Sequence, residues 1–177
     1  LDIVAEKGIP ISPVFTGPWI ACEHGEELGF NAPMVARMRE QLEINYETIR
    51  RARKKGIEIL GGSDTGNAAV FVHGRWHGKE AEIFVKELGM TQTEAIAANT
   101  SKNAAMVGLK DKVGIVAKGK LADIVVWDND PVRDITVLQR PTEISVIVKD
   151  GKIVDREVEG FRHLKEEPRR AKAYIRS

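Results

Sequence analysis

The chain has little cysteine, little net charge, few aromatic residues and no long hydrophobic run. Its single cysteine, Cys22, excludes an internal disulfide and fits a reducing cytoplasm. Basic and acidic side chains number 27 and 26, a net charge of +1, so no overall field attracts nucleic acid or anionic membrane. No apolar stretch approaches the length of a membrane span. We therefore expect a cytoplasmic protein with neither nucleic-acid nor membrane partners.

What the chain does have is a globular composition. Hydrophobic residues make up 42% and charged residues 30% of its 177 residues, which gives room for one domain or for parts of two. The sequence begins at Leu1 without an initiator methionine, as expected for a processed, cleaved or truncated product.

The most regular pattern lies between residues 31 and 55. Asn31 is a good N-cap, and apolar residues then recur every three or four positions: Val35, Met38, Leu42, Tyr46, Ile49 and Ala52. This spacing predicts one long amphipathic helix. Its basic end, residues 53–55, suits the helix dipole, and no aromatic residues accompany it as they would in a nucleic-acid patch.

Two short apolar segments, Ile9 to Phe15 and Ile57 to Gly62, flank this helix. We predict that they are adjacent parallel strands joined by a right-handed crossover of a (β/α) barrel. Pro10 and Pro13 cannot donate ladder hydrogen bonds and limit the first strand. Residues 17–29 show no clear period and are expected to form a loop in which Trp19 could line a pocket.

Later residues change from helices to strands. Helices are predicted at residues 79–88, from Gln92 after the capping box Thr91 to Glu94, and at 100–107. From Val113 onward two alternating runs follow, VGIVAKGKLADIVVWDNDP and ISVIVKDGKIVDREV, with turns at Lys118-Gly119 and Asp150-Gly151. They predict a separate antiparallel sheet.

The stretch Gly56 to Gly66, GIEILGGSDTG, is the main candidate for a functional site. Its pattern predicts a buried strand that ends just before Asp64. In α/β folds, catalytic and binding residues usually lie at the carboxyl ends of such strands. Ser63 and Thr65 could orient the Asp64 carboxylate, although each is also an ordinary turn residue. On these residues alone, Asp64 is as well explained as the cap of a turn.

The order of several motifs resembles the C-terminal half of the metal-dependent amidohydrolase superfamily, nearest to imidazolonepropionase-like and Xaa-Pro dipeptidase-like members. These motifs are GGSDTG, HG before EAEIFVKELGMTQTEAI, AANTSKNAAMVGL, VGIVAKGKLADIVVWDNDP and VIVKDGKIV. The resemblance implies an α/β fold: the last units of a TIM-like (β/α)8 barrel in residues 1–112, part of an antiparallel β-sandwich in 113–158, and an extension in 159–177.

In this family the aspartate that corresponds to Asp64 binds metal and transfers protons. The resemblance therefore implies a hydrolase of C–N bonds with one or two divalent ions, of which zinc is the expected metal, and a small amide or dipeptide substrate. A divalent metal lowers the pKa of a water molecule that it binds from ~15.7 toward ~7, and a nearby carboxylate can move its proton. His73, Trp19, Ser63 and Thr65 are the candidates for substrate binding.

The family's other ligands have no counterpart in this sequence. The His-x-His pair, the Lys or Glu of the fourth strand and two further histidines are absent, and His73 with His77 makes a poor pair because Gly74 interrupts a regular helix. We expect an inactive fragment that requires the N-terminal part of the barrel and forms a homo-oligomer. The alternative is an inert structural or binding module derived from an amidohydrolase.

Overall fold

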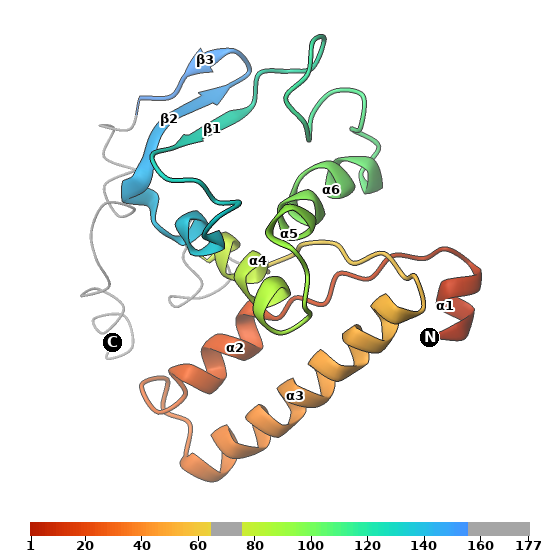
Figure 1. The fold of residues 1–177 in the computed structure, drawn as a ribbon. Coiled ribbons are helices and arrows are strands. Elements are labelled where there is room, and N and C mark those ends of the chain that lie inside the picture. The colour runs from red at the N-terminus through yellow and green to blue at the C-terminus, as the bar shows by residue number, and fades with distance from the viewer. Residues whose placement is uncertain (65–75, 156–177) are drawn as a thin grey trace.

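The computed structural model describes residues 1–64 and 76–155 of the chain (Figure 1). Helices occupy most of the first part, and a small antiparallel sheet lies beside them in the last part. The elements in chain order are α1 (Asp2–Glu6), α2 (Thr16–Glu23), α3 (Ala32–Lys54), α4 (His77–Lys86), α5 (Gln92–Asn99), α6 (Ser101–Met106), β1 (Ile124–Trp127), the 3-10 helices η1 (Ile135–Gln139) and η2 (Pro141–Glu143), β2 (Ile144–Lys149) and β3 (Lys152–Ile153).

The long helix α3 forms as predicted. The side chain of Asn31 caps it by accepting a hydrogen bond from the backbone N–H of Met34 at 2.9 Å. Its buried residues are Leu42, Tyr46, Ile49 and Ala52, four members of the predicted apolar stripe. The stripe faces the rest of the molecule because burial of these side chains provides most of the stability of such a helix.

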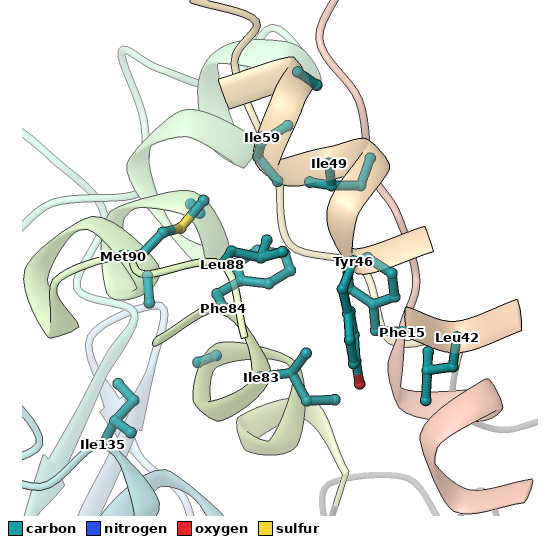
Figure 2. Close-up of a cluster of buried hydrophobic side chains, with 14 of the residues drawn as sticks. Phe15, Leu42, Tyr46, Ile49, Ile59, Ile83, Phe84, Leu88, Met90 and Ile135 are labelled. Atoms are coloured by element: carbon teal, nitrogen blue, oxygen red, sulfur yellow. The ribbon is translucent and has the colours of Figure 1, made fainter. Parts of the chain in front are cut away.

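The core lies between α3 and α4 (Figure 2). Phe84 of α4 is fully buried. Phe15 meets Tyr46 edge to face, with 4.7 Å between the ring centroids, an arrangement that aromatic pairs prefer. Ile59, from the segment that leads to Asp64, enters the same cluster. The candidate site is therefore anchored to the main core through the segment that precedes it.

The two predicted parallel strands are neighbours, but they are much shorter than expected. Ile11 and Ile59 form an isolated parallel bridge, in which Ile11 N–H donates to the carbonyl of Glu58 and Leu60 N–H donates to the carbonyl of Ile11, each at 2.9 Å. The expectations of strands over Ile9 to Phe15 and over Ile57 to Gly62 were both wrong in length, because only the single bridge between Ile11 and Ile59 forms within these two segments. Pro10 and Pro13 on either side of Ile11 lack the N–H that a longer ladder requires.

The prediction of a loop over residues 17–29 was wrong in its first part, because α2 occupies Thr16–Glu23. Pro18 is compatible with the first turn of this helix, where backbone N–H groups have no partner within the helix. The backbone N–H groups of Phe15 and Thr16 donate instead to the carboxylate of Glu80. This cap comes from a residue 64 positions away and leaves no local signal in the sequence.

The other helices agree with the sequence patterns. The predicted capping box is present at the start of α5, where Thr91 and Glu94 exchange hydrogen bonds. The basic end of α3 serves the fold: Arg50 Nε donates to the carbonyl of Glu87 at 2.6 Å, and Arg53 donates to the carbonyl of Leu88. These arginines bind carbonyl groups at the C-terminal end of α4 and thereby join the two helices. In the described ranges, none of the helices combines the length and apolarity needed to cross a membrane.

The C-terminal sheet is antiparallel, in the order β1-β2-β3. Its hairpin turns at Asp150 and Gly151, which have φ angles of 52° and 77°, as the sequence predicted. The prediction of strands from Val113 to Leu121 was wrong: that segment contains turns, and Leu121 N–H donates back to the carbonyl of Lys112 at 2.8 Å. Its backbone groups bond locally because no neighbouring strand pairs with them in the described part of the chain.

Candidate functional site

The segment that leads to Asp64 is held by hydrogen bonds from two sides. Besides the bridge to Ile11, Gly61 N–H donates to the carbonyl of Ala98 at 3.0 Å. Asn103 Nδ2 donates to the carbonyl of Gly61 at 2.9 Å. These bonds join the segment to the end of α5 and to α6. The backbone two to three residues before Asp64 therefore has a defined position.

The two glycines before Ser63 are required by close neighbours within the protein. A Cβ on Gly61 would lie 2.0 Å from Oδ1 of Asn99, and one on Gly62 would lie 2.4 Å from Oγ of Ser12. The space beside these two glycines is taken by the side chains of Asn99 and Ser12.

Asp64 lies at the end of this segment with an exposed side chain. Its φ of 50° is in the left-handed region, which aspartate tolerates better than most residues. The preceding Ser63 is buried, and its hydroxyl lies 2.8 Å from Nδ1 of His77 at the start of α4. A solvent-facing carboxylate beside an anchored serine can bind a cation or accept a proton.

The other candidate residues are placed only in part. Thr65 and His73 lie outside the described residues. Trp19 lies on α2, half-buried, with its ring centroid 6.3 Å from that of Trp76 and with Lys79 Nζ 3.9 Å above the ring centroid. The structure thus packs Trp19 against the beginning of α4, and its proposed role in substrate binding stays a prediction.

Glu80 is a residue that the sequence analysis missed. It is fully buried, and its carboxylate accepts hydrogen bonds from Phe15 N–H at 2.9 Å, Thr16 N–H at 2.8 Å and Thr16 Oγ at 2.6 Å. Burial raises the pKa of Glu80, while the three hydrogen bonds oppose that change. The available signal was a charged residue on the apolar face of a predicted helix, beside Ala81 and Phe84.

Close packing fixes the first turn of α4 against the C-terminal part of the chain. A Cβ on Gly78 would lie 2.3 Å from the carbonyl oxygen of Leu138 in η1 and 2.5 Å from its carbonyl carbon. Only glycine allows the helix to approach the η1 backbone so closely. The turn that carries His77 and Glu80 is therefore wedged between the strand ends and η1.

The described residues do not form a metal site by themselves. Within residues 1–64 and 76–155, no group of three or more histidine, cysteine, aspartate or glutamate side chains could hold an ion. Asp64 offers one carboxylate, whereas a catalytic zinc site uses about three protein ligands. The geometry fits a contribution to a metal site and does not fit a complete one.

The comparisons with known proteins decide the family. The model of the Amidohydrolase family matches residues 1–154. The chain belongs to this family. Members of the amidohydrolase family are generally metal-dependent. The identification agrees with the resemblance found in the sequence motifs.

Solved amidohydrolases with similar folds include a Xaa-Pro dipeptidase with bound methionine, with a TM-score of 0.70 and 29% identity over 87% of this chain. A prolidase complexed with N-methylphosphonate-L-proline has a TM-score of 0.69 and 25% identity over 88%. Ochratoxinase of Aspergillus niger has a TM-score of 0.69 and 26% identity over 86%. In a sequence comparison, the same ochratoxinase is 29% identical over 122 residues, 67% of this chain.

These relatives are much longer than the chain. The chain spans 24% of the ochratoxinase sequence, and 36% and 37% of the solved Xaa-Pro dipeptidase and prolidase. Its likeness therefore concerns one part of the amidohydrolase architecture.

Proposed function

We propose that this chain is the C-terminal portion of a metal-dependent hydrolase that acts on C–N bonds. The bond is an amide, a cyclic amide or a Xaa-Pro-like dipeptide bond. The observation that carries the proposal is the exposed carboxylate of Asp64, presented beside the buried Ser63 at the end of an anchored segment. Amidohydrolase membership and the prolidase, dipeptidase and ochratoxinase relatives support this reaction class.

In this proposal Asp64 has two roles in the complete protein. Its carboxylate is one ligand of a divalent metal, with zinc as the preferred ion, and it takes a proton from the attacking water and delivers it to the leaving amine. The metal supplies electrostatic activation of water and of the scissile carbonyl. Trp19, Ser63, Thr65 and His73 are proposed to bind or orient the substrate.

The described residues do not complete a metal site, so we propose that the remaining ligands come from another part of the protein, which docks at a broad groove. The groove has a volume of about 850 Å³. Its lining includes Pro10, Leu60, Met106, Val116 and Val125, of which Met106 and Val116 are 61% and 82% exposed. Large exposed apolar surfaces mark interaction sites. We propose that the N-terminal part of the barrel and sandwich covers this groove, and that the complete protein forms a homo-oligomer.

The proposed architecture follows from the same assignment. Residues 1–112 are the last units of a TIM-like barrel, and residues 113–158 are part of a β-sandwich, of which the structure describes the chain to residue 155. The extension 159–177 lies outside the described residues. On its own, the chain is expected to be inactive because a single carboxylate cannot retain a catalytic metal.

The test is hydrolysis of a panel of Xaa-Pro dipeptides, N-acyl amino acids and cyclic amides by the complete protein. We expect turnover of at least one class, loss of turnover on treatment with a chelator, and recovery when Zn²⁺ is returned. A complete, folded protein that binds no divalent metal and hydrolyses none of these compounds would instead be an inert module derived from an amidohydrolase.

A further inference from the structure

The first turn of α4 touches both strand ends of the candidate site. His77 Nδ1 lies 2.8 Å from Ser63 Oγ, one residue before Asp64. Three positions later, Glu80 holds the backbone N–H groups of Phe15 and Thr16, just after the segment that pairs with Ile59. Residues three apart on a helix lie on the same side. One helical turn therefore supports the ends of both segments.

We propose that His77 is a positioning residue for Asp64 and acts through the hydroxyl of Ser63. This inference deepens the proposed function and rests on it. The side chain of Asp64 is exposed, so packing does not fix its direction. The hydrogen bond between Ser63 and His77 constrains Asp64 indirectly, because it holds the residue to which Asp64 is covalently joined.

The support beneath His77 is rigid enough for this role. Gly78, the next residue, lies against the backbone of Leu138 with no room for a Cβ. Glu80 is fully buried and makes three hydrogen bonds to the start of α2. A side chain on such an anchored turn can define the place of a neighbouring loop, since its own backbone has little freedom.

His77 itself is exposed. Replacing it removes little buried apolar surface, and losing its hydrogen bond with the buried Ser63 hydroxyl costs about 1–3 kcal/mol, less than the stability of a typical domain. The geometry of Asp64 can therefore be disturbed without unfolding the protein. This separation between geometry and stability distinguishes a positioning role from a structural one.

A Ser63–His77 pair also has the composition of a nucleophile and its base. Two observations favour positioning: Ser63 is buried, with 9% of its surface exposed, and the exposed acid at this strand end is Asp64. The two roles predict different behaviour. A nucleophile is indispensable, whereas two residues that position a third residue through one bond show non-additive, partial losses.

The experiment compares four variants of the complete protein: His77→Leu, His77→Asn, Ser63→Ala and the double variant Ser63→Ala/His77→Leu. Asparagine is the conservative replacement, because its side-chain amide reaches the place of Nδ1 with the same number of bonds from Cα. Gln92→Leu is the matched control, since Gln92 is the first residue of α5 as His77 is of α4. The readouts are kcat, KM and amide hydrogen exchange of residues 57–64.

We expect His77→Leu to lower kcat by on the order of 10- to 100-fold, the loss that a small misplacement of a reacting group causes, with KM changed less than about 3-fold. Ser63→Ala and the double variant should show the same loss, and amide exchange at residues 60–64 should become faster. His77→Asn should retain most of the turnover and protection, and Gln92→Leu should resemble the wild type.

Three results would overturn the inference: unchanged kcat and exchange in a folded His77→Leu protein, no rescue by His77→Asn, or complete loss of turnover in Ser63→Ala alone. The exchange measurement does not depend on activity. If the complete protein proved to be no hydrolase, faster exchange at residues 60–64 in His77→Leu would still show that His77 orders the Asp64 segment, and unchanged exchange would refute it.

Discussion

At the scale of single residues, two glutamates that lie two positions apart on α4 have pKa values shifted in opposite directions. Burial raises the pKa of Glu80. Burial also acts to raise the pKa of Glu82, but hydrogen bonds from Lys79, Lys86 and Gln139 outweigh it and lower that pKa to about 2. Glu82 thus joins α4 to η1 through Gln139, whose Nε2 lies 2.7 Å from Glu82 Oε2.

The hydrogen bonds of Glu82 predict that the free energy of unfolding falls at acidic pH. The folded-state pKa of about 2 is below the ordinary value of 4.5, so the unfolded chain binds more protons between these pH values. The stabilisation is fully present above about pH 4.5 and is lost as the pH falls toward 2. It amounts to on the order of 3 kcal/mol by linkage.

This prediction is checked by urea denaturation of the wild type and of Glu82→Gln between pH 2 and pH 7. The variant should be less stable at pH 7 and should lose less free energy of unfolding on acidification. Parallel curves for the two proteins over the whole range would show that Glu82 does not carry this dependence.

At the scale of elements, the sequence predicted what local patterns determine. The α3 stripe, the Thr91–Glu94 capping box and the Asp150-Gly151 hairpin are short-range signals, and all three are confirmed. The start of α2 was not predictable in this way, because its N–H groups are bound by Glu80 from a distant part of the chain. Likewise, residues 113–121 have an alternating pattern but no strand beside them in the described part of the chain.

Removing the Glu80 carboxylate, which caps the start of α2, should strongly destabilise the protein. Glu80→Ala leaves three buried donors without their acceptor, two on the backbone and one on Thr16, and should destabilise the protein by about 3–5 kcal/mol. Glu80→Gln should cost less because it keeps the size and one acceptor oxygen. Glu40→Ala on the exposed face of α3 is the control and should change the free energy of unfolding by less than about 0.5 kcal/mol.

Chemical denaturation followed by circular dichroism measures these differences. Equal midpoints for Glu80→Ala and Glu40→Ala would mean that the start of α2 does not depend on the buried carboxylate.

At the scale of the whole molecule, the described residues position one candidate metal ligand, Asp64, and leave a wide apolar groove uncovered. The placement of Asp64 just beyond a segment anchored in the core could be predicted from the sequence, since an apolar run and two glycines lead to it. The contacts that His77, Asn99 and Asn103 make with this segment could not be predicted, because each depends on how distant elements pack.

The 177-residue chain, expressed alone, should associate with itself or with the complementary N-terminal part, as unpaired sheet edges and apolar surfaces do. Light scattering checks this, and a monodisperse monomer would contradict it.

The central claim is that Asp64 performs the chemistry, and the most direct measurement is the turnover and metal content of Asp64→Asn in the complete protein. The amide keeps the shape of the carboxylate but loses its charge and basicity, so turnover should fall by at least ~100-fold to ~10,000-fold and metal retention should weaken. Glu58→Gln, the same change at an exposed acid six residues earlier, is the control, with thermal unfolding to verify the fold. A folded Asp64→Asn protein with near-normal turnover and metal content would contradict the account and leave Asp64 as a loop residue.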